Sequence, residues 1–271
     1  MAGDRAYTDI SSWVVANGGY VHPALAVCER GSAGLGLSVN APVSAGQVLV
    51  ALPPRLHVTI DSCLRGAALA AVEKEVPPNK WDVRLALALL ALIREGDLKA
   101  QPGPQSANSL APSAPANKPG GFAAPKNNKK NTTVARSSAV GWATYIETLP
   151  SALALPIFYT GAQLREFEME FPQMAGEVGG RVQLLKSVSS ALKSLYMQYD
   201  NPSDGWFGDV SLRRLAWAYA IVSSRAVRLE GPDAPGVLLP LLDLANHDFA
   251  PSCQILHLGQ QRDAASAQVI N

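Results

Sequence analysis

The stretch from Trp81 to Asp97 is apolar on nearly every side when it is wound as an α-helix. Its sequence, WDVRLALALLALIREGD, fills the middle with Leu, Ala and Ile residues. A helix at the surface of a domain shows a single apolar stripe, so a helix like this one must be covered on several sides. We therefore expect a helix buried inside the domain, with Asn79 as its N-cap and Gly96 as its C-terminal stop.

β-Strands are predicted earlier in the chain, where apolar residues recur with a period of two. Gly34 to Val39 alternates in this way, and Gln47 to Leu52 is a second apolar run. Pro42 and Gly46 lie between the two runs and suit a turn. We expect short antiparallel β structure in this part of the chain.

Three further helices are predicted between these strands and the C-terminal part. The first covers Leu164 to Phe171, and the second is an amphipathic helix between Gly179-Gly180 and Asn201-Pro202. The third covers Leu212 to Val222, with Asp209 or Ser211 as its N-cap. Helices inserted between β segments at either end make the predicted fold class α+β.

Residues 101–136 interrupt this regular pattern. They contain six prolines and five basic residues but no acidic residue. Such a segment buries too little apolar surface to offset the entropy lost on ordering, so we expect a disordered insertion. Its basic residues could form a nucleic-acid patch, but they are dispersed and lack interleaved aromatic residues. A solvated low-complexity loop is therefore the favoured interpretation.

Composition and charge exclude several classes of protein. The chain has 23 basic and 22 acidic residues, which gives no general reason to bind nucleic acid or an anionic membrane. Its three cysteines are far apart and form no CxxC pair, which argues against a structural zinc site or a disulfide framework. The longest apolar run is too short to span a bilayer, and no secretory signal is visible at the N-terminus. We expect a soluble intracellular protein.

Two local features could contribute to a ligand site. Gly34-Leu35-Gly36 resembles part of a nucleotide-binding loop, but it lacks the third glycine and opens into a strand, so the alternative is simply a glycine-rich start of a strand. Ser224-Arg225 ends the third predicted helix. An arginine there can complement the helix dipole and stay solvated, or it can grip a carboxylate.

A third feature is the run Asp243-Leu244-Ala245-Asn246-His247, which follows the apolar segment Val237-Leu238-Leu239. Asn and Asp commonly close a strand into a turn, so a purely structural turn is the alternative to a binding site. A metal site would need further ligands, and neither Asp248 nor His257 has a recognised spacing, so no metal is expected. The sequence contains no GxSxG, P-loop or HExxH motif.

The order of these features resembles the SET-domain protein methyltransferases, in particular the subgroup typified by plant Rubisco large-subunit lysine methyltransferase. The matching segments are SSWVVANGGYVHPALAV, GLGLSVNAPVSAGQVLVALPPRLHVT, VGWATYIETLP, IVSSRAV and LLPLLDLANHDFAPSC. The second of these is similar to the first β hairpin of that subgroup. The resemblance implies a SET fold with an N-terminal β part at residues 1–60, a helical insertion at 61–210 and a C-terminal β part at 211–271.

The resemblance also implies an activity and a set of binding residues. The activity would be transfer of a methyl group from S-adenosyl-L-methionine to a side-chain amine of a protein substrate, usually lysine, without a metal. The compartment would be the cytoplasm or the chloroplast. The cofactor would be bound by Ala33, Gly34, Leu35, Ser224, Arg225, Asp243, Asn246 and His247.

The sequence also departs from that family. The family continues past its asparagine-histidine motif into a glycine-acidic stretch and a tyrosine followed by glycine, and neither occurs before Asn271. None of the seven tyrosines has a comparable context, so no catalytic residue is assigned. We expect a truncated chain with an incomplete pocket and little or no activity. The alternative is a non-catalytic SET-like module that binds a protein partner.

Overall fold

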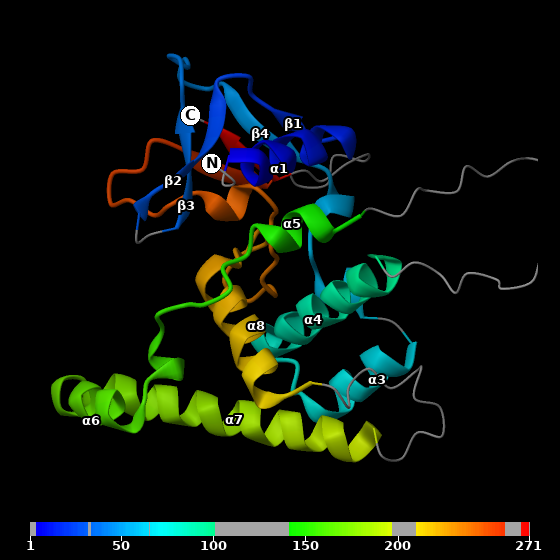
Figure 1. The fold of residues 1–271 in the computed structure, drawn as a ribbon, viewed down its shortest axis with the longest axis vertical. Helices are drawn as coiled ribbons and strands as arrows, with labels where there is room; N and C mark the ends of the chain where they lie inside the picture. The colour runs from blue at the N-terminus through cyan, green and yellow to red at the C-terminus, as the bar shows by residue number, and fades with distance from the viewer. Residues whose placement is uncertain are drawn as a thin grey trace, which may run out of the picture.

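Strands and most helices occupy opposite ends of the molecule, and helix α5 lies between them (Figure 1). The computed structural model describes residues 4–31, 34–64, 66–100, 141–196, 210–257 and 267–270. The architecture is mixed α+β, as the sequence predicts. The predicted disordered insertion at 101–136 lies outside the described residues.

The described strands form two antiparallel sheets. One has the order β1-β4-β6-β5, and the other is the pair β2-β3. The strands are β1 (Tyr20–Val21), β2 (Leu25–Glu29), β3 (Leu35–Val39), β4 (Val48–Leu52), β5 (Gln254–His257) and β6 (Ala267–Ile270). Because β6 lies between β4 and β5, strands from the N-terminal and C-terminal parts of the chain share one sheet.

The expected hairpin of the two predicted strands is wrong in its pairing, although both strands exist. β3 pairs with the preceding strand β2, whereas β4 joins the other sheet. The tight turn explains this difference, because the Arg30 amide donates to the Gly34 carbonyl at 2.7 Å. Gly34 has a φ of 77°, which a glycine adopts without the steric cost that other residues meet.

Apart from α1 near the N-terminus, the described helices lie in the middle of the chain, between β4 and β5. Within the described residues, no helix is both long and apolar enough to cross a membrane. The helices are α1 (Asp4–Ala16), α2 (Ile60–Cys63), α3 (Gly66–Glu75), α4 (Trp81–Ala100), α5 (Ala143–Glu147), α6 (Gly161–Glu170), α7 (Pro172–Tyr196) and α8 (Leu212–Arg225), with short 3-10 turns η2 (Pro54–Leu56), η3 (Pro156–Phe158) and η5 (Leu242–Leu244).

All four predicted helices are present, but several of their ends differ. Ser211 caps α8, since its side chain accepts from the Arg214 amide. Asn79 is not the N-cap of α4, because the first helical hydrogen bond is accepted by the Lys80 carbonyl. α4 continues through Gly96, and α7 begins at Pro172 and runs through Gly179-Gly180. Proline suits a first helical turn, and a glycine inside a helix costs only about 1 kcal/mol, which packing can offset.

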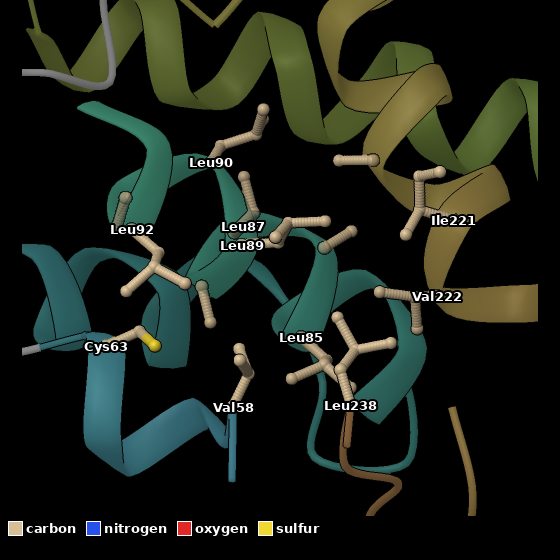
Figure 2. Packing of buried hydrophobic residues seen from close by; sticks show 14 of the residues in the cluster. Val58, Cys63, Leu85, Leu87, Leu89, Leu90, Leu92, Ile221, Val222 and Leu238 are labelled. Atoms are coloured by element: carbon tan, nitrogen blue, oxygen red, sulfur yellow. The ribbon is translucent and has the colours of Figure 1, made fainter. Parts of the chain in front are cut away.

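α4 is the centre of the core, as its apolar pattern predicts. Leu85, Leu87 and Leu89 have no exposed area, and the helix packs against α8 and α2 (Figure 2). Leu238, from the C-terminal part, lies in the same cluster. It exchanges two backbone hydrogen bonds with Val58, at 3.0 and 3.1 Å. The predicted apolar strand at 237–239 therefore exists only as isolated bridges.

Replacement of Leu87 tests the central place of α4. Leu87→Ala should lower the free energy of unfolding by about 2–5 kcal/mol, because it leaves a cavity in the core. Met169→Ala is the control, since Met169 on α6 is 79% exposed. That change should stay within about 0.5 kcal/mol. Urea unfolding measures both, and equal small losses would contradict burial of α4.

Candidate functional site

β3 and the chain that follows η5 meet at Gly36. A Cβ atom added to Gly36 would lie 2.8 Å from Nδ2 of Asn246 and 2.9 Å from Cγ of Arg30. The Asn246 amide therefore occupies space that a side chain on β3 would fill. Two sequence features that lie more than two hundred residues apart are thus brought together.

Arg30 is a residue of this crevice that the sequence does not reveal. It directly follows β2, and its Nη2 donates to the Leu37 carbonyl at 3.2 Å. Its side chain is exposed and crosses the β2–β3 pair at Gly36, beside Asn246. Only the β2–β3 register could have identified it, because Arg30 belongs to no motif. We call Gly36, Arg30 and Asn246 the Gly36 crevice, a name that stands for the contact of these three residues.

A buried polar network holds η5, the turn that precedes Asn246. The Asp243 side chain on η5 has no exposed area. The Tyr145 hydroxyl on α5 donates to Oδ2 of Asp243 at 2.8 Å. Nη1 of Arg225, the last residue of α8, lies 3.7 Å from the same oxygen and donates to the Asp243 backbone carbonyl at 3.4 Å. We call these three residues the Asp243 network.

Burial controls the protonation of the Asp243 network. Desolvation raises the pKa of Asp243 from its ordinary 3.8 to about 6, against the lowering effects of Arg225 and the Tyr145 hydrogen bond. Burial likewise raises the pKa of Tyr145 well above its ordinary value. Tyr145 is therefore a neutral hydrogen-bond donor. Oδ1 of Asp243 is buried and has no hydrogen-bond partner within the described part of the chain.

The turn before Asn246 is held in an unusual backbone conformation. Leu241 has φ 71° and ψ −46°, the only positive φ of a described residue other than glycine. Such a conformation is strained for leucine and persists only where its surroundings fix it. Leu241 itself is fully buried. The segment thus forms a turn, and this turn delivers Asn246 to β3.

The remaining predicted residues are placed as follows. Gly34 and His247 are exposed, and Leu35 is half-buried at the start of β3. The Ser224 hydroxyl donates to the Ala220 carbonyl at 2.8 Å, so it is used within its own helix. Ala33 lies outside the described residues.

Arg225 differs from both sequence alternatives in one respect. Its side chain is only 15% exposed, so it is not a solvated helix-end residue. It does approach a carboxylate, but that carboxylate belongs to Asp243 of the same chain. Arg225 therefore links α8 to η5.

Potential metal ligands do not converge in the described part of the chain. No group of three or more His, Cys, Asp or Glu side chains there could hold a metal ion. Asp248 instead accepts a hydrogen bond from the Ala250 amide at 2.9 Å, which closes its own loop. The crevice offers an amide, a guanidinium and backbone groups, which suit an organic ligand with carboxylate and ammonium groups.

Replacement of Gly36 tests the contact with Asn246. Gly36→Ala should displace the Asn246 amide and the Arg30 stem, both of which are side-chain atoms that can move. We expect a stability change within about 1 kcal/mol but a large shift of the Asn246 side-chain amide resonance in nuclear magnetic resonance spectra. Gly180→Ala is the control, because an added Cβ meets no atom within 4 Å there. An unshifted Asn246 resonance in Gly36→Ala would refute the contact.

The raised pKa of Asp243 predicts a pH dependence of stability. Between about pH 4 and 6 the folded protein holds a proton that the unfolded chain has released, so this group makes stability fall as pH rises. Asp243→Asn removes that effect. His57, whose burial lowers its pKa, contributes the opposite slope, but it does so in both proteins. We expect the free energy of unfolding of Asp243→Asn, relative to that of the wild type, to increase as the pH rises from about 4 to 7. A pH-independent difference would contradict the burial of the carboxylate.

Comparisons with known proteins give a fold but no sequence family. No protein-family model and no curated protein matches the chain. The SET domain of LSMT bound to lysine and AdoHcy matches with a TM-score of 0.65 and 19% identity, over 100% of this chain and 51% of that one. Rubisco LSMT bound to AdoMet matches with a TM-score of 0.60 and 20% identity, over 97% and 49%. This chain thus spans about half the length of those structures, and it has the SET-domain fold.

Proposed function

We propose that the chain is the S-adenosyl-L-methionine-binding part of a SET-type protein-lysine methyltransferase, and that the cofactor binds in the Gly36 crevice. The observation that carries this proposal is the seating of the Asn246 amide on the side-chain-free position of β3. The solved SET-domain structures with the same fold hold AdoHcy or AdoMet, which supports the choice of cofactor.

The residues of the crevice fit the chemical groups of this cofactor. S-adenosyl-L-methionine carries a carboxylate, an ammonium and a sulfonium. The Arg30 guanidinium lies beside Asn246 and can pair with a carboxylate. The Asn246 amide can supply a donor and an acceptor for the other polar groups, and the Gly34 carbonyl, which already accepts from the Arg30 amide, has a second lone pair. His247, which is exposed next to Asn246, can cover the adenine end.

The chain would contribute positioning to the reaction. The bound cofactor supplies an electrophilic methyl group on its sulfonium. A deprotonated lysine amine of a protein substrate would take this methyl group in an in-line displacement, and the cofactor would leave as its thioether. Such an in-line displacement depends mainly on alignment of the two reactants and exclusion of water. The residues of the Gly36 crevice would hold one of the reactants in that alignment.

The chain would divide into three parts. Residues 1–60 are the N-terminal β part of the SET fold and residues 211–271 its C-terminal part, which together would bind the cofactor, and residues 61–210 are a helical insertion. The position of β6 between β4 and β5 supports the first assignment, because it joins the two parts in one sheet.

Calorimetry with S-adenosylhomocysteine, the demethylated cofactor, tests this proposal. The 271-residue chain should bind it at a single site. Asn246→Ala and Gly36→Ala should each weaken binding at least about tenfold, since tenfold corresponds to about 1.4 kcal/mol, the order of one well-placed hydrogen bond. Gly180→Ala should bind like the wild type. Absence of binding would reject the proposed function and favour the non-catalytic module. If Asn246→Ala and Gly36→Ala both bind S-adenosylhomocysteine as tightly as the wild type, the proposed site is wrong.

A further inference from the structure

We propose that Tyr145 is a positioning residue of the Gly36 crevice, which acts through Asp243. Its hydroxyl holds the Asp243 carboxylate from one side while Arg225 holds it from the other, and together they fix the turn that delivers Asn246 to β3. The role in cofactor binding rests on the proposed function, whereas the role in fixing the turn does not.

Tyr145 is itself held firmly in place. It lies on the five-residue helix α5 and has no exposed area. Its ring packs edge-on with the Trp142 ring, with 6.4 Å between the ring centroids. The Trp142 ring in turn packs on Trp13 of α1, with 5.5 Å between their centroids. The Trp13 indole nitrogen donates to the Gly141 carbonyl at 2.6 Å, which ties α5 to α1. The hydroxyl is therefore presented to Asp243 from a rigid support.

The Tyr145 hydroxyl makes the short contact in the Asp243 network. At 2.8 Å it is well within hydrogen-bond distance of Oδ2, whereas Nη1 of Arg225 is 3.7 Å from that atom. Oδ1 has no hydrogen-bond partner within the described residues. Without the hydroxyl, the carboxylate would keep the longer contact with Arg225 and the interaction with its own backbone amide. A buried carboxylate with so little support either takes up a proton or moves.

A movement of Asp243 would reach Asn246 directly. Asp243 is the middle residue of the 3-10 turn η5, and Asn246 follows two residues after its end. The turn is short and begins after the strained Leu241, so its own hydrogen bonds define its direction poorly. The side-chain anchor at Asp243 supplies the missing constraint, because it ties the turn to α5 and α8.

The titratable groups around Asp243 come from three elements. Tyr145 of α5 and Arg225 of α8 face the carboxylate, and the thiol of Cys63 on α2 lies near Tyr145. Among these, the Tyr145 hydrogen bond and Arg225 both lower the pKa of Asp243. Removal of the hydroxyl should therefore raise that pKa further above its ordinary value.

A matched pair of variants tests the inference. Tyr145→Phe removes only the hydroxyl. Tyr219→Phe is the control, because Tyr219 is also buried and its hydroxyl also hydrogen bonds to a carboxylate, that of Asp82, far from the turn in the sequence. Urea unfolding should show a similar loss of stability in both variants. A difference between them in the exchange of the η5 amides, the Asp243 titration or ligand binding is then due to positioning and not to stability.

Two readouts need no ligand. Hydrogen exchange of the amides of Asp243, Leu244 and Ala245, which all donate hydrogen bonds in this turn, should quicken about tenfold in Tyr145→Phe, as expected for loss of one hydrogen bond. The Asp243 carboxyl titration, followed by carbon-13 resonance, should move to higher pH. Neither should change in Tyr219→Phe.

The third readout is calorimetry with S-adenosylhomocysteine. Its dissociation constant should rise about tenfold in Tyr145→Phe and stay unchanged in Tyr219→Phe. If Tyr145→Phe leaves exchange and titration as in the wild type, or if Tyr219→Phe changes them equally, the inference is overturned. If the wild type binds no S-adenosylhomocysteine, the proposed function fails. Exchange and titration then decide the positioning role without it.

Discussion

Burial of α4 on several sides is the constraint from which the arrangement of the rest follows. An apolar helix without a polar face must be covered by other segments of the chain. α4 packs against α2, which precedes it in the sequence, and α8, which follows it. Leu238 lies in the same cluster. Its backbone hydrogen bonds to Val58 bring the C-terminal segment next to the N-terminal one. η5 begins only four residues after Leu238, so the same packing that buries α4 sets the position of Asn246.

Hydrophobic packing alone leaves the direction of η5 loosely defined, because apolar contacts are not directional. The Asp243 network supplies the direction. A buried ion pair seldom adds net stability, since desolvation costs about as much as the attraction returns. The raised pKa of Asp243, and an Oδ1 that has no hydrogen-bond partner among the described residues, indicate that this cost has not been fully offset. We interpret the network as a contribution to specificity, which joins α5, α8 and η5 in one geometry.

Local pattern was sufficient for much of the fold and for the outline of the site. The buried α4, both strands and the Ser211 cap depend on residues close together in the sequence, so a period or a capping residue predicts them. The β3–β2 pairing and the insertion of β6 depend on chain segments outside those patterns. Tyr145 lies 98 residues from Asp243, and no spacing rule links them. A tyrosine before an apolar segment is most simply a core residue, which Tyr145 also is.

The polar residues around Asn246 divide into a buried group and an exposed group, and this division changes the roles that the sequence predicts for them. Sequence resemblance assigns Arg225 and Asp243 to direct contact with the cofactor, yet the structure pairs them with each other, with little or no exposed side-chain area. Exposed groups remain at the crevice itself, namely Asn246, His247 and Arg30. Charges that are fixed inside a low-dielectric interior make rigid supports but poor first contacts for an arriving ligand, because they must exchange partners first. In the proposed site, the exposed residues would therefore recognise the cofactor and the buried ones would hold them in position.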